Sequence, residues 1–508
     1  MEGFSRKEYL SLKMPTEEVP VSDSGRIRLA LQALGYDPVE MPLEVLRRLY
    51  PMCREADFDI TVTLVHREYD WVLTDIEPGD QRDSHYGLAV DYGSTTVVMQ
   101  LVDMNSGAVV AEEKAVNGQV IYGTDILSRI TYSLEGEQHL RQLQQVTADT
   151  FQHLLETLRE SSGIDTARLP VMIVSGNTTM IHFLLGLNGW PVFASPYAPV
   201  VEDPGFFRGR ELGMDFAGLV YIIPAASNYV GGDIVSGLLT LDIHKKDGVS
   251  MFFDIGTNGE LVIGNKDWIV AGAGAAGPAL EGYISKFGMR AEAGAVDSVK
   301  ISGKEMRITT ISGAKPVGIC GSGIIDLLAQ MRRSGWMDVS GSLEPAVSER
   351  IVFLPEQQEY AVVYAPAEET PDGKPRYFSQ TDIHQYLDTK AAAYTMVDCL
   401  LDSAGVRPEE LEMCYLSGAF AAHSDLESAI TIGIFPDLPR EKYRVLKNSS
   451  LDGARCLLLD HSRLKEAGEL AENIYGIQFA SIPDFLVRMQ AAKFVPHTDR
   501  ERFPSVQL

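Results

Sequence analysis

Two aspartates in this chain each end an apolar run and begin a turn that contains glycine. The first, Asp91, is followed by Gly93 and by three hydroxyl residues, Ser94, Thr95 and Thr96. This order predicts a β-hairpin whose turn can face a phosphate, because glycine admits close approach of the backbone and hydroxyls donate to anionic oxygens. A carboxylate at the strand end can hold magnesium through water. Asp-x-Gly turns also join ordinary hairpins, so this turn alone leaves a purely structural role open.

The same pattern occurs a second time. Asp254 follows another apolar run, and Gly256, Thr257 and Asn258 belong to the polar turn after it. An internal repeat of this kind predicts two similar lobes. The acetate and sugar kinases, heat-shock chaperone ATPases and actin hold a polyphosphate between paired hairpins, and the chain resembles that superfamily. The resemblance implies an α/β, two-lobed ribonuclease-H-like (actin-like ATPase) fold that binds ATP and Mg²⁺, with Asp91 and Asp254 holding the metal through water.

Length and charge limit the classes of partner. The chain has 508 residues, 45% of them hydrophobic, which is too long for one core and predicts several domains. Its 44 Lys and Arg against 70 Asp and Glu give a formal charge of −26. Such a charge repels nucleic acid and anionic membranes, so we expect neither as a partner. A nucleotide site must therefore create its own positive field from magnesium, backbone amides and helix N-termini.

The cysteines do not have metal-ligand spacing. The chain contains no Cys-x-x-Cys pair, and we expect buried small hydrophobes at Cys53, Cys320, Cys399, Cys414 and Cys456. No iron–sulfur cluster is therefore expected in this chain. The first residues lack the apolar core of a signal peptide, and no apolar run approaches a membrane span, so the expected location is the cytoplasm.

Hydrophobic periodicity and the segments that interrupt it divide the chain into three predicted domains. We expect a small α+β N-terminal domain over 1–85, ATPase lobe I over 86–245, and ATPase lobe II with C-terminal helices over 246–508. In the first domain, spacing predicts helices over 24–34 and 43–50, paired strands over 60–65 and 69–74, and a linker at 76–80.

Lobe I contains two carboxylates with alternative roles. A loop opens a helix on which Asp125 and Arg129 lie four residues apart, which is typical of a surface ion pair but also fits residues that line a site or a lobe contact. Asp233 follows two glycines at the start of a helix. It is either an N-cap or the group that orients a water toward the γ-phosphate.

Lobe II contains further glycine-rich turns next to predicted helices. Gly277 lies in a small-residue run, and Gly321, Ser322 and Gly323 precede an apolar helix. For both segments, the glycines are explained either by tight helix packing or by close approach of the backbone to a nucleotide. A helix over 379–404 carries Lys390, which is expected in solvent unless it faces inward. A late strand ends at Gly418 and Ala419, the turn that meets the adenosine in the two-lobed ATPases that the chain resembles.

The ordered motifs resemble a narrower family, the ATP-dependent reductive activators of corrinoid proteins. The segments that carry the resemblance are 91–96, 122–130, 176–180, 230–233, 254–260, 277–282, 319–323 and 416–420. The resemblance implies an ATPase that returns cobalt(II) to cobalt(I) in a corrinoid protein of a methyltransferase system, often as a homodimer.

The chain departs from this family in several places. Members commonly carry an iron–sulfur domain, which is not expected in this chain, so a separate low-potential donor is expected to supply the electron. Gly118, Lys447 and Ala421 also differ from the usual residues of their loops. Two other functions stay open: a small-molecule kinase, and a nucleotide-switched binder of corrinoid proteins without reductase activity.

Overall fold

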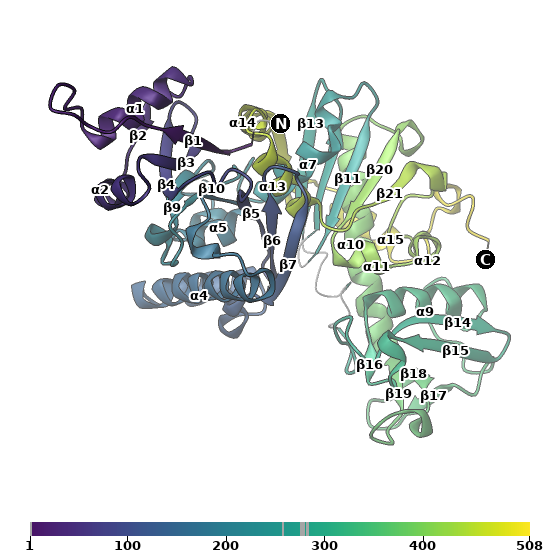
Figure 1. Ribbon diagram of the computed structural model, residues 1–508. Helices are drawn as coiled ribbons and strands as arrows, with labels where there is room; N and C mark the ends of the chain where they lie inside the picture. Colours follow the sequence, from purple (N-terminus) through teal and green to yellow (C-terminus); the bar gives the residue numbers. More distant parts are fainter. Residues whose placement is uncertain (1–2, 257–258, 275–279, 281–283, 508) are drawn as a thin grey trace. The chain divides into compact units, whose positions relative to one another are not determined.

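The computed structural model describes residues 3–256, 259–274, 280 and 284–507. The chain forms two compact units of mixed α/β structure (Figure 1). Unit 1 comprises Met1–Asp242 and Ser449–Asn473, and unit 2 comprises Ile243–Asn448 and Ile474–Leu508. The chain thus passes from one unit to the other after Asp242, after Asn448 and after Asn473.

The N-terminal region of unit 1 contains a small sheet and two helices. The sheet has the order β1 (Ser5–Ser11), β3 (Asp59–His66), β4 (Trp71–Pro78) and β2 (Val39–Glu40), and the helices are α1 (Asp23–Ala33) and α2 (Leu43–Glu55). The predicted helices and the antiparallel strand pair are confirmed. The linker predicted at 76–80 is wrong in its first half, because β4 continues to Pro78. The division into three domains stays a prediction.

A six-stranded sheet forms the centre of unit 1. Its order is β7 (Val109–Val116), β6 (Thr96–Asp103), β5 (Tyr86–Tyr92), β8 (Val171–Gly176), β10 (Leu219–Ile222) and β9 (Gly205–Arg208). The helices are α3 (Ile126–Leu134), α4 (Glu137–Ser162), α5 (Thr178–Leu184), α6 (Trp190–Phe193), α7 (Gly232–Leu241), α13 (Ser449–Leu459) and α14 (Arg463–Asn473). Adjacent side chains of a strand point to opposite faces. Tyr92 therefore faces α4, where its hydroxyl lies 2.9 Å from that of Thr147, and Asp91 faces α13.

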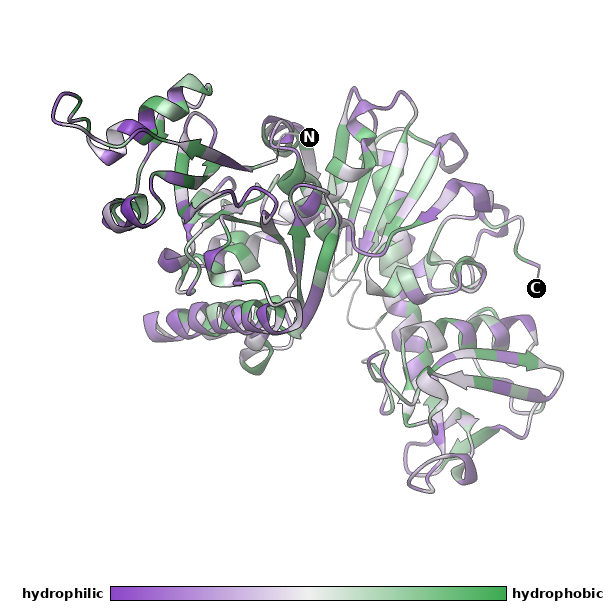
Figure 2. Ribbon diagram, in the orientation of Figure 1, coloured by the Kyte–Doolittle hydropathy of each residue, from purple (hydrophilic) through white to green (hydrophobic). Residues whose placement is uncertain are grey.

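Unit 2 repeats the arrangement of five of these strands, and its sixth strand lies at the opposite edge of the sheet. Its main sheet has the order β21 (Tyr443–Val445), β20 (Met413–Ser417), β11 (Ser250–Ile255), β12 (Gly259–Gly264), β13 (Ile269–Gly274) and β22 (Ile474–Ile477). The strand that carries each aspartate, β5 or β11, pairs antiparallel with the next strand and parallel with a later one. The internal repeat predicted from the two hairpins is confirmed. The strands of both six-stranded sheets are mostly hydrophobic, whereas α4 carries many hydrophilic residues (Figure 2).

Two three-stranded sheets and several helices complete unit 2. The sheets are β15 (Glu305–Thr310), β14 (Ala295–Ser302) and β16 (Gly318–Ile319), and β17 (Ile351–Leu354), β18 (Glu359–Ala365) and β19 (Arg376–Ser379). The helices are α9 (Gly321–Arg333), α10 (Gln380–Ser403), α11 (Ala419–His423), α12 (Leu426–Ile432) and α15 (Phe485–Ala492). None of the helices that the structure describes has both the length and the apolar character to cross a membrane.

Lys390 on α10 is buried rather than solvated. Its side chain is 0% exposed, and Nζ donates to the backbone oxygens of Ala492, Phe494 and Pro496, the second at 2.8 Å. Burial lowers the pKa of Lys390 well below its ordinary value. The expectation of a solvated lysine is wrong, because the C-terminal segment covers this face of α10 and supplies three acceptors to the ammonium group.

Helices α7 and α13 of unit 1 pack with almost no space between their backbones. A Cβ atom on Gly453 of α13 would lie 2.0 Å from the backbone oxygen of Ser236 on α7. The Ser236 hydroxyl also donates to the backbone oxygen of Ser450 at 2.6 Å. Gly453 therefore permits the close approach that brings the start of α13 to the sheet.

Gly453→Ala is expected to destabilise unit 1 by about 3 kcal/mol, since an added methyl group must displace backbone in a close-packed contact. Gly468→Ala is the matched control, because it lies inside α14 with no atom within 4 Å of an added Cβ. The control should gain about 0.5–1 kcal/mol, since alanine is the better helix former. Urea denaturation followed by circular dichroism measures both changes, and equal stability of the two variants would contradict the packing argument.

Candidate functional site

Close packing and two hydrogen bonds from Asn117 hold the first hairpin turn in place. A Cβ on Gly93 would lie 2.5 Å from the backbone oxygen of Thr96, so only glycine fits here. The buried Asn117 donates from Nδ2 to the oxygen of Gly93 and from its backbone N to the oxygen of Thr95, both at 2.9 Å. The structure thus brings Asp91, Gly93, Ser94, Thr95 and Thr96 together in one braced hairpin.

Asp91 is hydrogen-bonded to a residue far away in the sequence. The hydroxyl of Ser450, at the start of α13, donates to Asp91 Oδ1 at 2.8 Å. Ser175, the β8 partner of Asp91, lies with its hydroxyl 2.9 Å from that of Ser450. The local sequence around Ser450 gives no reason to connect it with Asp91.

Asp233 lies in the first turn of α7, at the carboxyl end of β8. The N-cap of α7 is Gly231, so the simple N-cap interpretation of Asp233 is wrong. A Cβ on Gly231 would lie 2.4 Å from Asn177 Cα and 2.8 Å from Asp233 Oδ1. Because Asn177 directly follows β8, and Asp91 pairs with Ser175 on β8, the two carboxylates lie at the same end of this strand. Polar groups at this edge of an α/β sheet are well placed to bind ligands.

Arg129 braces the loop that supports the hairpin. It is 0% exposed, and its Nε donates to the backbone oxygen of Gly123 at 2.9 Å. Its Nη2 has no hydrogen-bond partner among the described residues, and burial lowers the pKa of Arg129. Asp125 instead caps α3, accepting from the backbone N of Ser128 at 2.8 Å. The surface ion-pair interpretation is therefore wrong, and a role in lining the site stays a prediction.

The second hairpin places Asp254 beside the late turn that follows β20. Asp254 pairs with Glu260 on β12 and with Ser417 on β20. Gly418 has φ +94°, and a Cβ there would lie 2.9 Å from Asp254 Oδ1. A Cβ on Gly256 would meet no atom of the described residues within 4 Å. Thr257 and Asn258 lie outside the described residues, and Ala419 is the first residue of α11.

The start of α9 contains the other predicted glycine-rich turn. Gly321 is the first helical residue, after Cys320 at the N-cap, and the Ser322 hydroxyl lies 3.3 Å from the Cys320 sulfur. A Cβ on Gly323 would lie 2.2 Å from the backbone oxygen of Val296, so helix–strand packing alone accounts for this glycine. Contact of this turn with a nucleotide stays a prediction. Gly277 lies outside the described residues.

Each hairpin, taken by itself, carries groups that fit a nucleotide phosphate with Mg²⁺. Magnesium prefers carboxylate oxygens as ligands and as acceptors for its bound water. Each unit has such a group one residue before the end of a strand, Asp91 on β5 and Asp254 on β11. The glycines at 93 and 418 keep side chains away from the neighbouring backbone at both turns. The turn at Gly93 also carries the hydroxyls that an anion requires.

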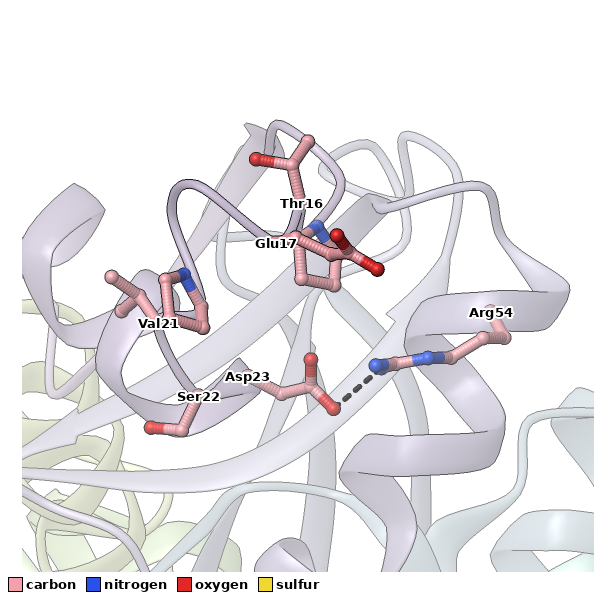
Figure 3. Close-up of a pocket in the computed structure, with 8 residues that line it drawn as sticks. Thr16, Glu17, Val21, Ser22, Asp23 and Arg54 are labelled. Atoms are coloured by element: carbon pink, nitrogen blue, oxygen red, sulfur yellow. Dashed lines mark hydrogen bonds and ion pairs between the residues drawn. The ribbon is translucent and has the colours of Figure 1, made fainter.

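A cavity of about 480 Å³ lies elsewhere, beside α1 and α2 (Figure 3). It is lined by the loop before α1, by Asp23 and by Arg54, and it contains none of the predicted site residues. Arg54 is bonded to Asp23 at 2.5 Å and lies 4.4 Å from the centre of the Tyr50 ring. Its charge is thus neutralised within the domain, and we assign no ligand to this cavity.

Comparison with known proteins places the chain in one family along its length. Residues 1–83 match the RACo linker region, 86–246 the RACo middle region, and 248–507 the C-terminal domain of RACo, the ASKHA domain. The actin-like α/β fold inferred from the hairpins is therefore confirmed.

Individual relatives agree with this assignment. The chain is 29% identical over 423 residues to the corrinoid activation enzyme RamQ of Eubacterium limosum, covering 82% of this chain and 71% of the relative. It is 25% identical to a Co(II) methylated amine-specific corrinoid protein reductase of Methanosarcina barkeri, covering 77% and 73%. The solved structure of a reductive activator for a corrinoid, iron–sulfur protein matches with a TM-score of 0.90 and 34% identity, covering 99% of this chain and 81% of that one. The chain therefore belongs to the family of reductive activators of corrinoid proteins.

Proposed function

We propose that this protein activates a partner corrinoid protein of a methyltransferase system by promoting the ATP-dependent reduction of its cobalt(II) to cobalt(I). The observation that carries the proposal is the 34% identity to a solved reductive activator over 99% of this chain. Two further relatives are named as a corrinoid activation enzyme and as a Co(II) corrinoid protein reductase. The partner is defined by its corrinoid, and the chain binds it as a protein rather than as a free cofactor.

The two hairpins perform the nucleotide chemistry in this proposal. Asp91 and Asp254 hold Mg²⁺ through water, and the turns that begin at Gly93 and Gly256 donate to the phosphates. Asp233 orients the water that attacks the γ-phosphate, giving ADP and inorganic phosphate. ATP, when bound, supplies the free energy that favours one conformation of the complex over another. The chain's own contribution is to hold these groups rigidly, as the Asn117 contacts to the first turn illustrate.

The electron comes from a low-potential one-electron donor outside these 508 residues. The step is cobalt(II) plus one electron to cobalt(I), so the donor is oxidised by one electron and no atom is transferred. Across the part of the chain that the structure describes, no cluster of three or more candidate metal ligands includes a cysteine. A homodimer is the assembly that we propose by analogy with the family.

Asp91→Asn and Asp254→Asn are expected to lower ATP turnover by about 100-fold each, since losing a charge that balances Mg²⁺ removes about 3 kcal/mol of stabilisation at the transferred phosphoryl group. Steady-state phosphate release measures the loss. Asp149→Asn, an exposed aspartate on α4, is the control and should retain the parent rate. Parent rates in both hairpin variants would refute the assignment of the metal to these carboxylates.

Asp233→Asn should lower turnover far more than nucleotide affinity, because a water-orienting carboxylate acts in the chemical step rather than in binding. A plot of rate against ATP concentration separates the two effects. An equal loss of both, accompanied by a lower melting temperature, would instead assign Asp233 to stabilising the first turn of α7.

The activator role predicts that cobalt(I) forms only when this protein, ATP, Mg²⁺ and a low-potential reductant are all present with the partner corrinoid protein. The visible spectrum of the cobalt, recorded anaerobically, reports the yield. Omission of ATP, or of this protein, serves as the control. If neither omission changes the yield with any corrinoid protein from the same cell, the reductase role is wrong and a nucleotide-switched binder is the better account.

A further inference from the structure

The environment of Asp91 contains a buried set of serines that the nucleotide chemistry above does not use. Ser450 donates to Asp91 Oδ1 at 2.8 Å, and the hydroxyl of Ser175 lies 2.9 Å from that of Ser450. Ser175 also lies within 3.2 Å of the backbone oxygen of Gly232 at the start of α7. An ionised carboxylate only accepts hydrogen bonds, so the Ser450 proton is committed to Asp91. The Ser175 proton is then shared between Ser450 and Gly232.

Ser450 is held in place before any ligand arrives. It is 5% exposed, and its backbone oxygen accepts from the Ser236 hydroxyl at 2.6 Å. One turn further along α13, Gly453 rests against the backbone of Ser236. The hydroxyl that reaches Asp91 is therefore fixed by contacts to α7 and β8, which is the condition under which a neighbouring group can orient a carboxylate.

Ser450 comes from a part of the chain that is far from Asp91 in the sequence. Asp91 and Ser450 are 359 residues apart, and Ser450 is the second residue of the segment Ser449–Asn473, which belongs to unit 1 although the residues before it belong to unit 2. The Ser450 side chain is thus a partner of Asp91 that the local hairpin sequence does not supply. The carboxylate of the first hairpin thus accepts a hydrogen bond from a returning segment of the chain.

We propose that Ser450 is a positioning residue that fixes the Asp91 carboxylate for the metal of the bound nucleotide. This inference rests on the proposed function, which assigns Asp91 to Mg²⁺. Ser450 itself need not touch the metal or the nucleotide. Its loss should leave the phosphate-binding hydroxyls of the hairpin in place while it removes a hydrogen bond that orients Asp91.

Titration of a non-hydrolysable ATP analogue with and without Mg²⁺ tests the proposal by calorimetry, without reference to turnover. For Ser450→Ala, the Mg²⁺ concentration at half-maximal analogue binding should rise about 10-fold or more, as is usual when a group that orients a metal ligand is removed. Binding of the analogue in EDTA should stay within about twofold of the parent. Ser450→Thr keeps the hydroxyl and should restore the parent Mg²⁺ dependence.

Ser462→Ala is the matched control. Ser462 is an exposed serine of the same returning segment, and its hydroxyl donates to Asp460 Oδ1 at 2.6 Å, so the variant removes the same type of bond away from Asp91. Its Mg²⁺ dependence should equal that of the parent. If Ser450→Ala fails to fold, Ser450→Cys, which keeps the volume but is a weaker donor, carries the same expectation.

The outcomes separate this inference from the proposed function. Parent Mg²⁺ dependence in a folded Ser450→Ala variant, equal weakening with and without metal, or a folded Ser450→Thr variant that fails to restore it would each overturn the positioning role. If the shift is found but no corrinoid protein is reduced, Ser450 keeps its role and the reductase proposal fails. If the parent itself shows no Mg²⁺-dependent binding, the assignment of the metal fails first.

Discussion

The close packing of α13 on α7 is the constraint on which the chemistry-bearing end of unit 1 depends. Gly453 allows the two backbones to meet, and the start of α13 then reaches β5 and β8, where Ser450 bonds to Asp91. Unit 1 is therefore completed by a segment that follows nearly all of unit 2 in the chain. Contacts of such long sequence separation form late, because their loop-closure entropy must be paid first. We expect the first hairpin to form locally and the orientation of Asp91 to be set only when this segment docks.

The features that the sequence predicted well are those with a strong local signal. Each aspartate hairpin combines an apolar run, a glycine turn and a second apolar run, and both hairpins and the strand repeat around them are confirmed. The helix capped by Ser379 was also predictable, because a capping residue and a long periodic segment coincide there. Short strands such as β2 and β22 have no such signal, since their pairing depends on distant neighbours. The docking of Ser449–Asn473 on unit 1 could not be predicted from the sequence for the same reason.

For two basic residues the solvent-exposed alternative is wrong, and for a common physical reason. Arg129 and Lys390 both lie on helices where a long cation is normally solvated, and helical spacing cannot tell which face another segment covers. In the structure both are 0% exposed, and backbone oxygens take the place of water: Gly123 for Arg129, and three C-terminal carbonyls for Lys390. A buried cation is tolerated when such acceptors are present. Without those covering segments, the same local sequences would leave both side chains in solvent.

The cysteines bear directly on where the electron of the proposed reaction comes from. An iron–sulfur cluster is held by several cysteines that lie close together, and among the described residues no group of three or more candidate metal ligands includes a cysteine. Burial raises the pKa of Cys399 to about 11 and that of Cys414 to about 12, and it also raises the pKa of Cys53. These thiols pack as small hydrophobes in the cores of both units. Under the proposed function, the chain therefore acts on the conformation of the partner through ATP, while the reducing power enters from a donor that the partner's corrinoid can reach.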